Sequence, residues 1–415
     1  MRVWLYSFAL FLYRQLVRLV SYVNPKAQLW NAGQFEVWEG LESIFSTNQR
    51  PVAWFHVASL GEFEQGKPVM EAFRSKYPAH FILLTFFSPS GYEIRKNTSG
   101  ADYVSYLPLD GSCSSQRFLD LVNPQIALFV KYEFWYFYLQ GLANRQIPTL
   151  LISAIFRPNQ VFFKWYGGFF RSLLGCFSQI FVQDEESKKM LEKINIQHVQ
   201  IGGDTRFDRV VQNLRQPKPW KVLDEFVDQQ AFMVVGSAWQ SDMDVLIPLI
   251  NSKEFPFKWV IVPHEIHLEE LKKWESAIHL KTQFSTDAPQ KDAQVLIVNQ
   301  IGYLSQIYRG ASFAFIGGAF GMGLHNTLEA SVFGPTVFFG NKNYTKFKEA
   351  RDLVEFGLAY PVEGTASLAH KMKEIYDAED VFVNKQVQAR TFVALQAGAT
   401  DKIMNYLNEN SHGIK

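Results

Sequence analysis

The stretch Phe313–Asn326 reads FAFIGGAFGMGLHN and joins an apolar run of strand length to a turn rich in glycine. Such a turn at the carboxyl end of a strand lets backbone N–H groups approach an anion, and a helix beginning near Asn326 adds positive potential. The spacing is neither GxGxxG nor the Gly-Lys-Ser/Thr of a P-loop, which disfavours both of those nucleotide sites. The stretch therefore predicts a phosphate-binding turn in an α/β domain. The alternative is a set of tight turns without a ligand.

Outward from this stretch, short apolar runs alternate with helical patterns along most of the chain. The runs of strand length are Val52–His56, Phe81–Thr85, Ile126–Val130, Thr149–Ser153, Gln179–Val182, Phe232–Val235, Trp259–Val262, Gln294–Val298, Phe313–Ile316 and Thr336–Phe339. Helical patterns separate several of them, for example Lys67–Lys76 and Glu185–Lys193. This alternation predicts mainly parallel sheets. It pauses at Arg215–Pro219, the clearest linker in the sequence.

Length and composition fit two folded domains. A chain of 415 residues exceeds what one hydrophobic core normally organises, and 47% hydrophobic with 20% charged residues excludes a largely disordered protein. A net charge of +1 gives no support for a nucleic-acid surface. The two cysteines fit a reducing compartment and make no metal-ligand spacing. We expect an α/β protein of two Rossmann-like domains, residues 31–215 and 220–415, that face an interdomain cleft.

Residues 1–30 differ from the rest of the chain. They contain four basic residues and no acidic one, and Val3–Tyr13 is almost wholly apolar. No small-residue cleavage site follows, which argues against a signal peptide. A helix here places Ser7, Arg14, Arg18 and Ser21 on one stripe, so we expect it to lie in a membrane's headgroup layer with its arginines reaching lipid phosphates. A transmembrane span and a buried core helix are the alternatives.

Two polar segments follow strands of the first half. In Ser59-Leu60-Gly61-Glu62 the spacing alone favours a helix-capping box, and the functional interpretation is a carboxylate, Glu62, at the ligand-binding edge of the sheet. Lys131-Tyr132-Glu133 lies at the equivalent edge after Ile126–Val130. Its two charges either orient an anionic acceptor or pair with each other.

Four blocks of the sequence together resemble a known family. They are His56–Glu62 (HVASLGE), Gly203–Asp208 (GDTRFD), Gly236–Trp239 (GSAW), and Gly317–Phe320 continued by His325–Ala330 (HNTLEA). In this order the chain resembles the 3-deoxy-D-manno-octulosonic acid (Kdo) transferases, which are GT-B glycosyltransferases that move Kdo from CMP-Kdo to a lipid A precursor. The resemblance extends over essentially the whole chain, including the hydrophobic N-terminus.

The resemblance implies roles for residues at the matching positions. Glu62 matches the general base, Arg206 a basic residue that stabilises charge as CMP leaves, and Lys131 or Glu133 a further polar position whose register stays open. Donor binding falls to the second half of the chain, at Ser237, Pro263, His264, Gly302, Tyr303, Leu304, Gly317, Gly318, Asn326, Thr327, Leu328 and Glu329. The family's Pro-Arg-His is replaced by Pro263-His264-Glu265, and its Gly-Glu-Leu by Gly302-Tyr303-Leu304. These departures put the phosphate contact of that region in doubt.

The resemblance also implies partners and a location. It makes CMP-Kdo the donor substrate, lipid IVA the acceptor, and the cytoplasmic face of the inner membrane the place of reaction, with residues 31–215 binding the acceptor and 220–415 the nucleotide sugar. We expect neither a metal nor a cofactor, because helix N-termini and basic side chains can neutralise the leaving phosphate. The alternatives are a GT-B enzyme that uses a UDP-sugar, a sugar-nucleotide epimerase, and a noncatalytic membrane-bound nucleotide-binding protein.

Overall fold

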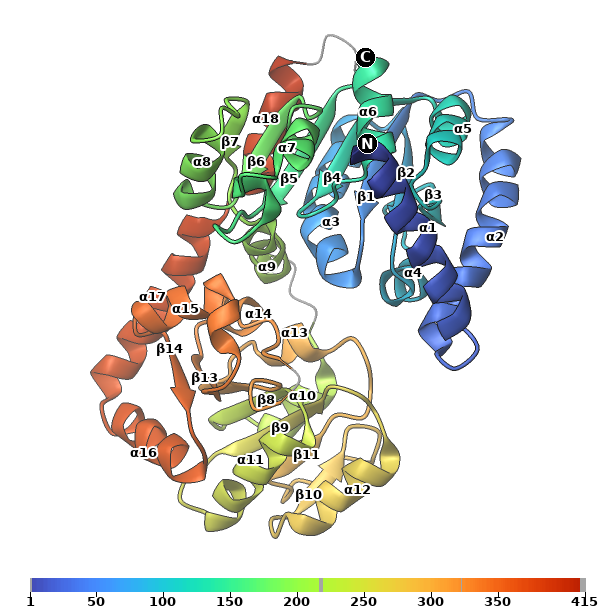
Figure 1. Cartoon of the computed structure of the whole chain (residues 1–415). Helices are drawn as coiled ribbons and strands as arrows, with labels where there is room; N and C mark the ends of the chain where they lie inside the picture. The colour runs from blue at the N-terminus through green and yellow to red at the C-terminus, as the bar shows by residue number, and fades with distance from the viewer. Residues whose placement is uncertain (1, 216–218, 322, 411–415) are drawn as a thin grey trace. The chain divides into compact units, whose positions relative to one another are not determined.

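The computed structural model describes residues 2–215, 219–321 and 323–410, which fold into two α/β units (Figure 1). The first unit comprises the described residues up to Arg209 together with those from Ala397 onward, and the second is Val210–Gln396. Most of the expected linker, residues 216–218, lies outside the described part of the chain.

The first unit is built on a seven-stranded parallel sheet of order β3-β2-β1-β4-β5-β6-β7. Its strands are β1 (Val52–Val57), β2 (Phe81–Phe86), β3 (Tyr103–Tyr106), β4 (Pro124–Val130), β5 (Thr149–Ala154), β6 (Gln179–Val182) and β7 (Val199–Ile201). The strands β1 and β5 are buried along their full length. Near-continuous apolar runs of this kind are typical of parallel strands, which are covered on both faces.

Helices cover both faces of this sheet. The helices of this unit are α1 (Arg2–Val20), α2 (Pro25–Phe45), α3 (Leu60–Lys76), α4 (Pro89–Arg95), α5 (Ser112–Val122), α6 (Tyr136–Asn144), α7 (Gly168–Leu174), α8 (Glu185–Glu192) and α18 (Ala399–Glu409), with the 3-10 turn η1 (Val161–Phe163). The helix α9 (Thr205–Arg215) begins in this unit and continues into the second. Side chains alternate between the faces, as in any strand. Trp54 packs with α2, α5 and α6, whereas its neighbour Phe55 packs with α3 and α18.

The C-terminal helix α18 belongs to the first unit, although the expected second domain ran from 220 to 415. Ile403, Met404 and Leu407 of α18 lie in the same hydrophobic cluster as Phe73 of α3. The Asp208 carboxylate also accepts hydrogen bonds from the backbone N–H groups of Gly398 and Thr400, the latter at 2.7 Å. Three apolar side chains on one face of α18 therefore complete the cover of the first sheet, a pairing that sequence order does not reveal.

The N-terminal helix α1 packs against α2 and leaves many of its apolar side chains exposed. No described residue of α1 is buried, which rules out the buried core helix, and α1 is long and apolar enough to cross a membrane. Of the expected polar stripe, Ser7, Arg18 and Ser21 are half-buried and Arg14 is exposed. Nine large apolar or aromatic side chains of α1 are exposed: Trp4, Leu5, Phe8, Phe11, Leu12, Tyr13, Leu16, Leu19 and Val20. The contact of the arginines with lipid phosphates stays a prediction.

The helix α2 crosses the expected boundary at residue 30. It runs from Pro25 to Phe45 and buries Trp30, Val37 and Leu41 in the core of the first unit. The Asn24 side chain caps it by accepting the N–H groups of Lys26 and Ala27. Residues 1–30 are therefore not a separate segment in the structure, because the first turns of α2 are already part of the α/β unit.

The second unit repeats the architecture with a seven-stranded parallel sheet of order β10-β11-β9-β8-β12-β13-β14. Its strands are β8 (Phe232–Ala238), β9 (Lys258–Pro263), β10 (Thr282–Phe284), β11 (Val295–Ile297), β12 (Phe313–Ile316), β13 (Thr336–Gly340) and β14 (Ala359–Val362). Its helices are α10 (Lys221–Val227), α11 (Gln240–Ser252), α12 (Leu268–Ala277), α13 (Leu304–Ile307), α14 (Leu328–Ser331), α15 (Lys348–Glu355), α16 (Thr365–Tyr376) and α17 (Glu379–Gln396), with the 3-10 turn η2 (Tyr344–Lys346). The helices α11, α12 and α16 share one hydrophobic cluster with β8 and β9.

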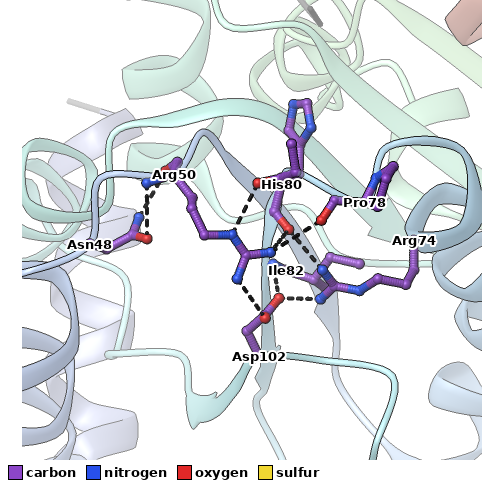
Figure 2. A network of polar contacts seen from close by, with 8 residues as sticks. Asn48, Arg50, Arg74, Pro78, His80, Ile82 and Asp102 are labelled. Atoms are coloured by element: carbon purple, nitrogen blue, oxygen red, sulfur yellow. Dashed lines mark hydrogen bonds and ion pairs between the residues drawn. The ribbon is translucent and has the colours of Figure 1, made fainter.

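A polar network ties together the amino ends of β2 and β3 in the first unit (Figure 2). Arg50 and Arg74 both bind the Asp102 carboxylate and the carbonyl oxygen of His80. Asp102 also accepts the N–H of Ile82 at 2.7 Å. Ligands of α/β sheets bind at the carboxyl ends of the strands. This network lies at the amino ends, so its role is structural.

Candidate active site

The carboxylate of Glu62 lies at the start of α3, directly after β1. Ser59 is the N-cap of α3, and its hydroxyl accepts the N–H of Glu62 at 3.5 Å. Oε2 of Glu62 accepts the N–H of Ala58 at 2.5 Å, one residue before the cap. The segment thus forms a helix cap and also holds a buried carboxylate at the carboxyl end of the sheet, so the two interpretations of Ser59–Glu62 do not exclude each other.

Inside the protein, the side chain of Glu62 holds its proton more tightly than it would in water. Burial, followed by the negative charge of Glu133, raises the pKa of Glu62 to about 7, and the N–H of Ala58 and the charge of Lys131 act in the opposite direction. A carboxylate with a pKa near neutrality is matched to proton transfer at cellular pH. Lys131 and Glu133 both act on Glu62, with opposite signs, so the structure brings together all three of these candidate residues.

The sequence did not single out the residues that surround Glu133. Its Oε2 accepts hydrogen bonds from His56 Nε2 at 2.9 Å and from Trp135 Nε1 at 2.6 Å. His56 is fully buried on β1 and its other ring nitrogen, Nδ1, lies 2.8 Å from Oγ1 of Thr85 on β2. His56 belongs to the HVASLGE block, but nothing in that block indicates a partner 77 positions further along the chain.

Two of the expected site residues, one in each unit, have a left-handed backbone conformation. Lys131 follows β4 with a φ of 65°, a left-handed conformation that costs a non-glycine residue about 1–3 kcal/mol. Ser237 has a φ of 54° at a register shift in β8 of the second unit. Such strain accumulates at functional sites, and both residues are among the expected site residues.

Arg206 lies at the start of α9 and is paired with a buried carboxylate. Its Nε and Nη2 donate to Oδ2 of Asp204 at 2.9 and 2.6 Å, while Gln65 of α3 donates to Oδ1. Burial alone would raise the pKa of Asp204, but the adjacent guanidinium outweighs it and holds the pKa below the ordinary value. Asp204 fixes the direction of the Arg206 side chain, a contact that the motif GDTRFD did not make evident.

The glycine-rich turn of the second unit is held by Asp242 of α11. Oδ2 of Asp242 accepts the N–H groups of Gly318 at 2.8 Å and of Trp239 at 2.9 Å. Gly318 has a φ of +92°, and a Cβ on it would lie 2.3 Å from the carbonyl oxygen of Gly323. A Cβ on Gly317 would lie 2.2 Å from the carbonyl oxygen of Ser237. Both glycines are thus required because the backbone of this turn passes close to the protein's own carbonyl oxygens, and phosphate binding by the turn stays a prediction.

Three aromatic rings stack beside this turn. The ring centroid of His264 lies 4.5 Å from that of Trp239 and 4.3 Å from that of His325. Trp239 Nε1 donates to Nε2 of His325 at 2.9 Å, which requires that nitrogen to be unprotonated. Burial, followed by the charge of His264, lowers the pKa of His325 to about 4, and burial lowers the pKa of His264 as well. His264 stands where the resemblance places an arginine, and its burial disfavours the charged form of the ring.

A short helix follows the turn, close to the expected start near Asn326. The helix α14 spans Leu328–Ser331 with Thr327 as its N-cap residue, and Asn326, one residue earlier, accepts the N–H of Leu328 at 3.1 Å. Asn326 Nδ2 donates to Oε1 of Glu329 at 3.1 Å, which fixes both side chains. A helix this short has a weak dipole, so Asn326 and Glu329 offer side-chain atoms more than a helix end.

The remaining candidates lie on separate segments of the second unit. Pro263 is the last residue of β9, and Leu304 is the first residue of α13. Tyr303 stacks on Trp220 with ring centroids 4.4 Å apart, and Gly302 has a φ of +98° with open space where a Cβ would lie. Thr327 and Leu328 are buried. Among the described residues, no group of three His, Cys, Asp or Glu side chains is arranged to hold a metal ion.

Solved structures with the same architecture define the fold class. UDP-GlcNAc 2-epimerase from Neisseria meningitidis aligns with a TM-score of 0.63 at 16% identity and covers 86% of this chain and 100% of its own. MurG from Acinetobacter baumannii aligns with a TM-score of 0.55 at 11% identity over 87% of this chain and 99% of its own. Two parallel seven-stranded α/β units with a glycine-rich turn in the second are the GT-B fold.

Sequence comparisons place the chain within that class. Residues 35–209 match the family model for 3-deoxy-D-manno-octulosonic-acid transferase (kdotransferase). The enzyme of that name from Aquifex aeolicus is 27% identical over 82% of this chain and 91% of its own, and that from Chlamydophila psittaci is 25% identical over 74% and 73%. The chain is thus similar to the Kdo transferases over most of its length, and this similarity indicates a glycosyltransferase of lipopolysaccharide biosynthesis.

Proposed function

We propose that this protein transfers Kdo from CMP-Kdo to the lipid A precursor lipid IVA, without a metal ion, at the cytoplasmic face of the inner membrane. The observation that carries the proposal is the buried carboxylate of Glu62, whose pKa is raised to about 7 at the carboxyl edge of the first sheet. Its position matches the general base of the Kdo transferases.

In the proposed reaction the acceptor hydroxyl attacks the anomeric carbon of Kdo. The bond between that carbon and the CMP phosphate oxygen breaks as the new carbon–oxygen bond forms. The Glu62 carboxylate takes the hydroxyl proton, and CMP leaves with the bonding electron pair. Positive charge near the leaving phosphate lowers the barrier, and Arg206 is the side chain that we assign to it.

Donor binding is assigned to the second unit. The Gly317-Gly318 turn offers backbone N–H groups, and Asn326 and Glu329 offer a linked amide and carboxylate that suit ribose hydroxyls. The stacked rings of Trp239, His264 and His325 provide an aromatic surface beside the turn. The same arrangement would suit another pyrimidine nucleotide, so a UDP-sugar is the competing donor.

Acceptor binding and location are supported by α1. Its exposed apolar residues have no cover among the described residues of the chain, and a helix of this kind binds the interface of a lipid bilayer. A membrane-bound enzyme meets a lipid acceptor in the plane of the bilayer.

The decisive test offers donors and acceptor side by side. Full-length protein is incubated with lipid IVA and either CMP-Kdo generated in situ or UDP-N-acetylglucosamine, with and without EDTA, and the lipid products are read by mass spectrometry. We expect a mass increase of Kdo from CMP-Kdo alone and no effect of EDTA. Transfer from the UDP-sugar only, or loss of transfer in EDTA, would refute the donor or the metal-free mechanism, respectively.

A further inference from the structure

A chain of buried hydrogen bonds links β1 and β2 to the segment that follows β4. Trp54 Nε1 donates to Oγ1 of Thr85 at 2.8 Å, and Thr85 Oγ1 lies 2.8 Å from Nδ1 of His56. The other nitrogen of His56 contacts Glu133 at 2.9 Å. Trp54, His56 and Thr85 have no exposed surface.

Contacts on both sides of the ring hold His56. Nδ1 lies 2.8 Å from Oγ1 of Thr85 and 3.2 Å from its carbonyl oxygen, and Oγ1 of Thr85 also lies 3.4 Å from the carbonyl oxygen of Phe55. Nε2 lies 2.9 Å from Oε2 of Glu133 and 3.1 Å from Nε1 of Trp135. Oε2 of Glu133 thus has two ring partners, because Trp135 Nε1 also donates to it at 2.6 Å.

We infer that His56 is a positioning residue: clamped by Thr85, it holds the charged carboxylate of Glu133 in place beside Glu62. Glu133 in turn acts on Glu62 through its negative charge, the second-largest influence on that group after burial. The inference rests on the proposed function for its catalytic meaning, but the geometry of the three residues stands independently of the substrate.

Three variants separate positioning from mere packing. His56→Leu keeps the volume and removes both hydrogen bonds. His56→Gln can still present an N–H to Glu133. His80→Leu is the matched control, since His80 is a buried histidine of the same unit at the opposite, amino end of β2, within the network of Figure 2.

The first readout is catalytic. Since a misplacement of about 1 Å can cost about 10²-fold in rate, we expect His56→Leu to lower kcat by up to about that factor with little change in KM for the acceptor. Without the contact to His56, the carboxylate of Glu133 can turn away from Glu62 and raise the pKa of Glu62 less, so the acid limb of the rate profile shifts to lower pH. His56→Gln should restore most of the rate and the profile, and His80→Leu should leave both unchanged.

The second readout needs no activity. Protein labelled with ¹³C at glutamate carboxyl carbons is titrated by NMR, and the Glu62 signal is assigned by its loss in Glu62→Gln. We expect the titration midpoint of Glu62 to fall in His56→Leu and to stay in His56→Gln and His80→Leu. If His56→Leu does not fold, His56→Asn, which can reach only the Thr85 side, carries the same expectation.

The two proposals fail in different ways. A wild-type enzyme without Kdo transfer refutes the proposed function, while the NMR titration still decides the role of His56. An active wild type whose Glu62 midpoint and pH profile are the same in His56→Leu refutes the positioning role.

Discussion

Nη2 of Arg206 lies 2.6 Å from Oδ2 of Asp204, a carboxylate with 7% of its surface exposed. Part of the Arg206 charge is therefore balanced by the protein before any substrate binds. Removal of Arg206 should have two consequences, one for catalysis and one for folding.

Arg206→Ala should lower turnover by an order of magnitude or more, because the loss of one charge-stabilising contact costs about 2.7–4 kcal/mol at comparable sites. It should also destabilise the fold, since breaking a buried ion pair leaves an uncompensated charge at a cost of about 3–5 kcal/mol. The double variant Arg206→Ala/Asp204→Asn separates the two effects in melting and rate measurements. We expect it to regain stability without regaining turnover; recovery of both would assign Arg206 a structural role alone.

The rate should depend on pH through Glu62. The base must be charged to accept a proton, so kcat/KM should fall as the pH decreases through about 7, the value to which the pKa of Glu62 is raised. Glu133→Gln removes a negative neighbour and should shift this limb to lower pH, whereas Lys131→Met removes a positive one and should shift it to higher pH. Shifts in the same direction in both variants would contradict the electrostatic account of this site.

Gly318→Ala should weaken donor binding through the turn. Its added Cβ meets the carbonyl oxygen of Gly323 at 2.3 Å, whereas Gly323→Ala introduces a similar left-handed strain at φ +127° with no atom within 4 Å. Calorimetric titration with CMP should show a loss of affinity of more than about tenfold for Gly318→Ala, or about 1.4 kcal/mol, beyond that of Gly323→Ala. Equal affinities in the two variants would place the nucleotide elsewhere in the unit.

Membrane association should depend on the apolar side of α1. Deletion of residues 1–23 should release much of the protein from membranes, and Leu12→Lys/Leu16→Lys should do the same while the Tyr6–Asp110 hydrogen bond is kept. The matched control is Val387→Lys/Leu395→Lys, which changes two exposed apolar residues of α17 in the second unit. Flotation with liposomes measures the bound fraction. A truncated protein that floats like the full chain would exclude α1 as the anchor.

The central strands could be predicted from the sequence, and the edge strands could not. All ten expected runs correspond to strands, whereas β3, β7, β10 and β14 were missed, and these four are the edges of the two sheets. They are only three or four residues long and include polar or half-buried positions, because one flank of an edge strand has no partner. A hydrophobic pattern is therefore weakest where the sheet ends.

The candidate site shows a similar limit. Glu62 and Glu133 were found because each follows an apolar strand, but the partners that set their properties come from other segments. His56 meets Glu133 across 77 positions, and Asp242 meets Gly318 across 76. Such contacts are fixed by sheet order, which local sequence does not contain. The helix start near Asn326 was predicted from the sequence, since α14 begins at Leu328, but its length of one turn was not.

The stability of the fold should respond to Glu62 as well. A carboxyl group whose pKa is raised in the folded state binds its proton more tightly there than in the unfolded chain, so its contribution to stability is lost as the pH rises through about 7. Glu62→Gln removes that dependence and can still accept the N–H of Ala58. Its melting temperature should therefore exceed that of the wild type by more at pH 8 than at pH 5.

The most direct test of glycosyl transfer by this site is product formation by Glu62→Gln, measured on one preparation beside thermal unfolding and CMP titration. Gln keeps the volume and the hydrogen bond of Glu62 but cannot take a proton, and general-base catalysis contributes about 10²–10⁴-fold. We predict CMP affinity and melting temperature at or above the wild-type level at pH 7, with Kdo transfer to lipid lowered by that factor. Transfer at close to the wild-type rate would contradict the account, because Glu62 would then be a helix cap and the base would lie elsewhere.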